Sequence, residues 1–313
     1  TTFRNVPRVY GYFEYTGTAF EGSLGVVQDF VASRGDGWRY TLDCLEELRR
    51  RTLGTAAPAA AGPLGEWLGD NFRAIFRLGA VTGQLHRALA TGSDPAFAPE
   101  PITAADLDAW IAAIAGSLTE NFGQLRRLGQ NLPPALRQRA AEALAREAAL
   151  RDRIGALRDQ VEPGLVKTRY HGDYHLGQVL WTGEDFVILD FEGEPARPLE
   201  QRRAKQSPLK DVAGMLRSFD YAAATAALKA GAGAAPPDWS EWLRLWQDRT
   251  AAEYLAGYLA EAERSPVPFV PRDPGRRRAW IEAFAMEKAI YELGYELNNR
   301  PDWVPIPLLA LGR

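Results

Sequence analysis

A short β-like stretch lies inside a chain whose pattern is otherwise mostly helical, and this contrast constrains the fold most. Within residues 166–191, two apolar runs, Val179–Trp181 and Phe186–Leu189, flank the polar turn Thr182–Asp185. Such runs on either side of a short turn predict a β-hairpin. Apolar residues recur at helical spacing in the longer segments 64–89, 103–128, 134–157, 211–229, 239–261 and 279–298. We therefore expect an α+β protein whose large helical body holds one hairpin.

The start of the chain predicts two strands. Arg8–Tyr15 is rich in aromatic and β-branched residues, and Leu24–Val31 reads as a second, more buried strand. Arg34–Trp38 breaks this pattern and serves as a connector. We expect a small unit at 1–33, made of two strands and a hinge, and a large helical unit at 34–313.

Composition argues against several classes of function. The net charge is −3 and the isoelectric point about 5.8, so the chain lacks the basic character that nucleic acids and anionic membranes select. A single cysteine, Cys44, allows neither a disulfide framework nor a cysteine-rich zinc site. No apolar run approaches the roughly 18 to 20 residues that span a bilayer. We expect a cytoplasmic protein with no nucleic-acid or membrane partner.

The residues around the hairpin carry the chemistry. The string His171-Gly172-Asp173-Tyr174-His175-Leu176-Gly177-Gln178 precedes the first hairpin strand, and Asp190 follows the second. Pairing of the two strands brings Gln178 and Asp190 together, with Asp173 on the loop that enters the first strand. Phosphoryl transfer needs a carboxylate at the attacking hydroxyl and oxygen ligands for Mg²⁺. We expect Asp173 to be the catalytic base and Gln178 and Asp190 to be the metal ligands.

The two histidines of this string also allow a different interpretation. His171 and His175 are spaced as half of a zinc site. The only other histidine is His86, and no cysteine lies nearby, so ligands to complete such a site are missing. We therefore favour the phosphoryl-transfer interpretation.

These residues resemble the maltokinases, a branch of the aminoglycoside-phosphotransferase-like kinases. His171–Leu180 resembles their catalytic loop, and Ile188–Pro195 and Ser207–Met215 resemble the segments that follow it. Tyr291–Trp303 resembles the closing segment of maltokinases fused to or partnered with trehalose synthase. The resemblance implies a protein-kinase-like two-lobe fold with a mostly helical C-lobe. We expect the N-lobe to be incomplete in this chain, because no lysine precedes Lys167 and no glycine-rich phosphate loop is present.

The resemblance also implies roles for individual residues, with ATP and Mg²⁺ as cofactors. His175 orients the catalytic loop or touches the substrate, and Asp211 braces that loop. The hinge that holds the adenine ring consists of Gln28, Asp29, Phe30 and Val31. The candidate substrate residues are Glu192, Lys288, Tyr291 and Tyr295, of which the last three share one helix face.

Three functions stay open at this point. The first is ATP-dependent phosphorylation of maltose at its anomeric hydroxyl, giving maltose 1-phosphate in trehalose, glycogen or α-glucan metabolism. The second is another small-molecule kinase of the same fold, acting on glucosamine or an aminoglycoside. The mixed charges of Lys288, Glu292, Glu296 and Arg300 favour a neutral sugar over a polycation. The third is a non-catalytic, pseudokinase-like module that binds sugar or docks an enzyme such as trehalose synthase.

Overall fold

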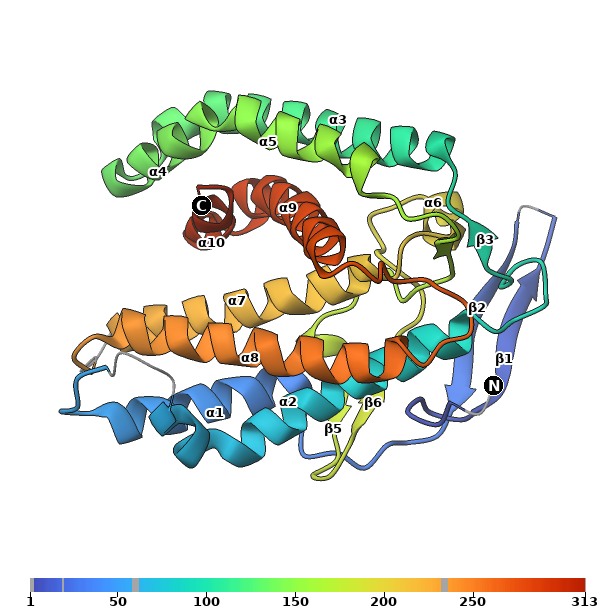
Figure 1. The fold of residues 1–313 in the computed structure, drawn as a ribbon, viewed down its shortest axis with the longest axis horizontal. Helices are drawn as coiled ribbons and strands as arrows, with labels where there is room; N and C mark the ends of the chain where they lie inside the picture. The colour runs from blue at the N-terminus through green and yellow to red at the C-terminus, as the bar shows by residue number, and fades with distance from the viewer. Residues whose placement is uncertain (1–2, 19, 58–61, 232–235, 313) are drawn as a thin grey trace.

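The computed structural model describes residues 3–18, 20–57, 62–231 and 236–312. They form a layered helical body with a two-stranded ribbon at one end (Figure 1). The helices are α1 (Gly37–Thr52), α2 (Gly62–Leu89), α3 (Ala104–Leu128), α4 (Pro134–Ala145), α5 (Glu147–Gly155), α6 (Leu199–Arg203), α7 (Leu209–Gly231), α8 (Trp239–Ala262), α9 (Pro274–Asn299) and α10 (Pro305–Leu311). The antiparallel strand pairs are β1 (Val9–Thr16) with β2 (Glu21–Gln28), β3 (Glu100–Pro101) with β4 (Val166–Lys167), and β5 (Val179–Trp181) with β6 (Phe186–Ile188). The expected α+β class and the hairpin at 179–188 are confirmed.

The helices stack in layers. In Figure 1, α3 and α5 lie above α9 and α10, which lie above α7 and α8, with α1 and α2 below. The closest pairing joins α2 to α8, where two glycines face the opposite backbone. A side-chain carbon added to Gly79 would collide with the carbonyl of Tyr254, and one added to Gly257 would collide with that of Phe76. Glycine is therefore required at this crossing. None of the described helices is long and apolar enough to cross a membrane.

Two sequence expectations about these elements are wrong. The second strand is not more buried than the first, because Leu24 and Val26 of β2 are 66% and 57% exposed. Within the described residues the ribbon has no layer packed over it, so apolar strand residues stay open to solvent. The helix expected over 134–157 divides into α4 and α5, because Arg146 between them has φ −90° and ψ 1°.

The connector after the ribbon is attached to the hairpin by backbone pairing. Arg34 N–H donates to Trp181 O at 2.7 Å, and Trp181 N–H donates to Gly35 O at 2.9 Å. Asp36 then caps α1 by accepting from Arg39 N–H at 2.7 Å. These bonds place the first turn of α1 beside the loop that carries Asp173.

Candidate active site

The loop containing Asp173 is supported by a buried carboxylate. Asp211, in the first turn of α7, accepts hydrogen bonds from the backbone N–H groups of His171 at 2.7 Å and Gly172 at 3.0 Å. Gly172 has φ +89°, a conformation that favours glycine, so the chain can turn sharply just before Asp173. Asp211 also lies 3.0 Å from Nε2 of His86, and both side chains are inaccessible or nearly so. Asp211 therefore lies in the bracing position that the resemblance implies.

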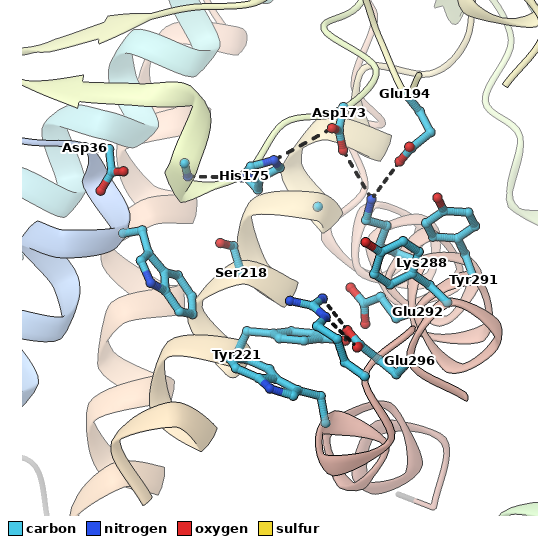
Figure 2. Close-up of a pocket in the computed structure, with 16 residues that line it drawn as sticks. Asp36, Asp173, His175, Glu194, Ser218, Tyr221, Lys288, Tyr291, Glu292 and Glu296 are labelled. Carbon is cyan, nitrogen blue, oxygen red and sulfur yellow. Dashed lines mark hydrogen bonds and ion pairs between the residues drawn. The ribbon is translucent and has the colours of Figure 1, made fainter. Parts of the chain in front are cut away.

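Asp173 lies between two groups that can carry positive charge. Lys288 Nζ is 3.4 Å from its Oδ1, and His175 Nε2 is 3.7 Å from its Oδ2 (Figure 2). His175 Nδ1 accepts from Gly177 N–H at 3.0 Å, which leaves the proton of a neutral ring on Nε2, facing Asp173. Burial alone would raise the pKa of Asp173, but His175 and Lys288 lower it to about 2. At neutral pH this carboxylate is therefore ionised and can accept a hydrogen bond from a hydroxyl.

The hairpin brings the two expected metal ligands together. Gln178 Nε2 donates to Asp190 Oδ2 at 3.0 Å, and Leu189 N–H donates to Gln178 O at 2.9 Å. Asp190 lies two residues after β6 ends and has φ +59°, an uncommon conformation for a residue other than glycine. The Gln178 side-chain carbonyl and the free Asp190 oxygen are hard donors of the kind Mg²⁺ prefers.

These two ligands fit a nucleotide-bound Mg²⁺ better than a metal held entirely by protein. Among the described residues, no group of three His, Cys, Asp or Glu side chains is placed to hold a metal ion. Mg²⁺ typically takes only one or two protein ligands and completes its shell with phosphates and water. Gln178 and Asp190 match that pattern.

A cavity of about 530 Å³ opens beside Asp173 (Figure 2). Its walls come from the end of the connector and the start of α1, the loop that carries Asp173, the segment after β6, α7, α9 and the segment before α10. The lining residues are Asp36, Trp38, Asp173, His175, Gly177, Glu194, Gly214, Ser218, Tyr221, Lys288, Tyr291, Glu292, Tyr295, Glu296, Arg300 and Trp303. The expected substrate residues Lys288, Tyr291 and Tyr295 thus lie in one cavity with Asp173 and His175.

The wall formed by α9 carries two carboxylates that are held by arginines. Arg217 Nη2 donates to Glu292 at 2.7 Å, and Arg300 Nη2 donates to Glu296 at 2.6 Å. Tyr221 OH donates to Glu296 at 3.1 Å, and its ring stacks on Trp303 with ring centroids 6.0 Å apart. This end of the cavity combines an aromatic surface with oriented charged groups, which suits the polar edges and apolar faces of a sugar ring.

The remaining expected site residues lie elsewhere. Glu192 does not line the 530 Å³ cavity; its side chain is 57% exposed and lies 3.5 Å from Arg202. Gln28 borders a separate, mainly apolar cavity of about 250 Å³ together with Leu189 and Asp190. Phe30 of the expected hinge is 95% exposed, and Asp29 N–H is bonded to Arg8 O at 2.9 Å.

Sequence reasoning missed several lining residues. Trp38, Ser218 and Tyr221 come from α1 and α7, far from the catalytic string in sequence. Glu194 and Trp303 carried a signal, since they lie in the segments 188–195 and 291–303 that resemble the family. The others are brought to the cavity by helix packing.

One family model and several known proteins match the sequence of this chain. Residues 64–193 match the model of the Phosphotransferase enzyme family. A glucosamine kinase from Streptacidiphilus jiangxiensis is 26% identical over 311 residues, covering 99% of this chain and 61% of that protein. One from Mycolicibacterium smegmatis is 26% identical over 310 residues, covering 99% of this chain and 67% of that protein. The chain therefore spans about three fifths of the length of the first relative.

Solved structures show the same fold. A glucosamine kinase in complex with glucosamine, ADP and inorganic phosphate superposes with a TM-score of 0.73 at 24% identity, covering 99% of this chain and 64% of that chain. A second crystal form of a glucosamine kinase gives a TM-score of 0.74, also at 24% identity, covering 99% of this chain and 65% of that chain. The chain thus has a kinase-like fold, and its residues 64–193 match the model of the Phosphotransferase enzyme family.

Proposed function

We propose that this chain forms the catalytic part of an ATP-dependent kinase that phosphorylates a small amino sugar. The observation that carries the proposal is the charge of the cavity around Asp173. Five carboxylates line it, and arginines hold two of them, Glu292 by Arg217 and Glu296 by Arg300. The three that remain, Asp36, Asp173 and Glu194, face one lysine, Lys288. Such an excess of negative charge attracts a substrate ammonium group. The names of the relatives, which are glucosamine kinases, support the same class of substrate.

The chain's own residues suggest how the transfer proceeds. The acceptor hydroxyl binds beside Asp173, whose carboxylate orients it and takes its proton. Gln178 and Asp190 would hold Mg²⁺, and that ion would supply positive charge to neutralise the nucleotide phosphates. His175 keeps Asp173 oriented through Nε2, because its Nδ1 is fixed by Gly177 N–H. The adenine ring is expected to bind at the hinge Gln28–Val31.

Maltose is the second candidate, and the size of the cavity favours it. A volume of about 530 Å³ exceeds the needs of one sugar ring, and Trp38, Tyr221 and Trp303 provide aromatic surface away from Asp173. Binding of a disaccharide there would leave the carboxylates to accept hydrogen bonds from sugar hydroxyls. The expected association with trehalose synthase has no support in the relatives.

A sugar panel tests the proposal. The full-length protein is incubated with ATP, Mg²⁺ and one of glucosamine, glucose, maltose, trehalose or an aminoglycoside, and ³¹P NMR identifies the product. We expect glucosamine to react faster than glucose, because only glucosamine carries an ammonium group. A preference for maltose selects the second candidate. Absence of nucleotide binding and of any phosphorylated sugar would point to the non-catalytic module.

A further inference from the structure

Lys288 is held less tightly than the other paired lysines of the described chain. Its Nζ lies 3.4 Å from Asp173 and 3.7 Å from Glu194. By contrast, Lys167 lies 2.6 Å from Asp106, and Lys205 lies 2.6 Å from Glu100. A charge-assisted hydrogen bond is normally about 2.7–2.9 Å long. Lys288 is therefore placed between two carboxylates without a short bond to either.

The position of Lys288 gives its ammonium access to substrate. The side chain is 28% exposed and lines the 530 Å³ cavity (Figure 2). It also borders a smaller cavity of about 50 Å³ behind Asp173, so it stands on the wall between the two. Its Nζ lies 5.1 Å from the centre of the Tyr291 ring, which leaves the ammonium supported but not fixed. A small rotation of the side chain would turn it toward a group bound at Asp173.

The site needs a cation at this point. A phosphoryl group in transfer carries charge on its equatorial oxygens, and here it would approach the ionised Asp173. Two arginines near the cavity are committed elsewhere, since Arg217 is 2.7 Å from Glu292 and Arg300 is 2.6 Å from Glu296. A third, Arg197, borders the smaller cavity and lies 3.8 Å from Glu287. Lys288 is the basic side chain next to Asp173 whose existing bonds are long enough to be exchanged at little cost.

We propose that Lys288 is a catalytic residue that donates a hydrogen bond to the transferring phosphoryl group. The inference rests on the proposed kinase function. As the acceptor oxygen forms its bond to phosphorus, the bond from phosphorus to the leaving oxygen of the nucleoside diphosphate breaks and that oxygen keeps the electron pair. The acceptor proton goes to Asp173. Lys288 exchanges its 3.7 Å contact with Glu194 for the phosphoryl oxygen and keeps its own protons throughout.

The test compares Lys288→Met and Lys288→Arg with Lys229→Met, which changes an exposed lysine in the last turn of α7. Turnover is measured with the preferred sugar, and calorimetry measures the affinities for ADP and for a non-hydrolysable ATP analogue. We expect Lys288→Met to lower kcat by about 10²- to 10³-fold, as loss of one donor to developing charge does. ADP affinity stays the same, and the gain in affinity from ADP to the triphosphate analogue is lost. Lys288→Arg recovers part of kcat and part of the gain in affinity for the triphosphate analogue. Lys229→Met resembles the wild type in both quantities.

The outcomes separate this inference from the proposed function. Wild-type turnover in Lys288→Met, or an equal loss of ADP and triphosphate affinity with folding intact, overturns the role of Lys288 while the kinase proposal stands. A lower kcat together with an unchanged difference in affinity between ADP and the triphosphate analogue would mean that Lys288 only positions Asp173. This result also overturns the inference. Failure of the wild-type protein to bind nucleotide or phosphorylate any sugar overturns both. The thermal unfolding midpoint of each variant shows whether it is folded.

Discussion

Asp211 accepts a 2.7 Å hydrogen bond from the backbone N–H of His171, and this bond ties helix α7 to the loop that carries Asp173. The same carboxylate accepts from Gly172 N–H and pairs with the buried His86. A single buried side chain thus satisfies two backbone donors and pairs with one buried imidazole. These bonds join the loop that carries Asp173 to α7.

We predict that Asp211→Ala lowers both stability and turnover. Each donor left unsatisfied in the interior costs about 1–3 kcal/mol, so the free energy of unfolding should fall by roughly 3 kcal/mol or more. Urea denaturation followed by tryptophan fluorescence measures the change. Asp152→Ala, at an exposed position on α5, is the matched control and should lie within about 0.5 kcal/mol of the wild type. Unchanged stability in Asp211→Ala would contradict the bracing role.

Asp173→Asn should remove most of the turnover and leave nucleotide affinity nearly intact. The amide keeps the size of the side chain but cannot take the acceptor proton, and a positioned acid–base group contributes about 10²- to 10⁴-fold to the rate. Single-turnover assays together with calorimetric ADP binding distinguish the two effects. Wild-type turnover would exclude Asp173 as the base.

Asp190→Asn should raise the Mg²⁺ concentration required for half-maximal rate more than Gln178→Ala does. A hard cation gains more from the charge of a carboxylate than from an amide dipole. We expect an increase of about 10- to 100-fold for Asp190→Asn, a range seen even when a residue that only supports a metal ligand is changed. Asparagine also tolerates the positive φ at this position, so the backbone should be retained. Mg²⁺ titration at saturating nucleotide provides the measurement.

The low pKa of Asp173 predicts how this group responds to pH. Burial opposes ionisation, but His175 and Lys288 bring the pKa to about 2 from its ordinary value of 3.8. Because the folded-state pKa is depressed, ionisation of Asp173 stabilises the fold fully above pH 3.8, and this contribution is lost as the pH falls through 2. The ¹³C carboxyl resonance should therefore show a midpoint well below 3.8 in the wild type and a higher one in Lys288→Met. A wild-type titration midpoint at the ordinary value of 3.8 would contradict the placement of His175 and Lys288 beside Asp173.

The crossing of α2 and α8 predicts opposite effects for two Gly→Ala changes. At Gly79 the added methyl would collide with the Tyr254 carbonyl, so Gly79→Ala should destabilise the protein by about 1–3 kcal/mol or more, as overpacking does. Gly116 on α3 has open space around it, and alanine there should stabilise the helix by about 0.5–1 kcal/mol. Thermal and urea unfolding of both variants give the comparison. Equal changes in the free energy of unfolding for Gly79→Ala and Gly116→Ala would show that α2 and α8 can move apart to admit the methyl group.

The sequence by itself determined the local features. Apolar runs on either side of Thr182–Asp185 predict the hairpin because alternation and turn residues act over a few positions. Pairing of the two strands then brings Gln178 and Asp190 together. The 3.0 Å hydrogen bond between their side chains confirms that they are neighbours. The face of α9 that carries Lys288, Tyr291 and Tyr295 follows in the same way from helical spacing.

Only the tertiary structure decided which distant residues share a cavity and which strands are covered. Trp38 and Tyr221 reach the site because α1 and α7 pack beside the catalytic loop, and no local pattern encodes such contacts. Lys288 could be placed on a helix face, but its 3.4 Å approach to Asp173 depends on how α9 packs against α7. Apolar residues in β2 predicted burial, yet burial needs a second layer, and among the described residues none covers that strand. Periodicity fixes which side of an element is apolar, whereas packing between elements determines what that side meets.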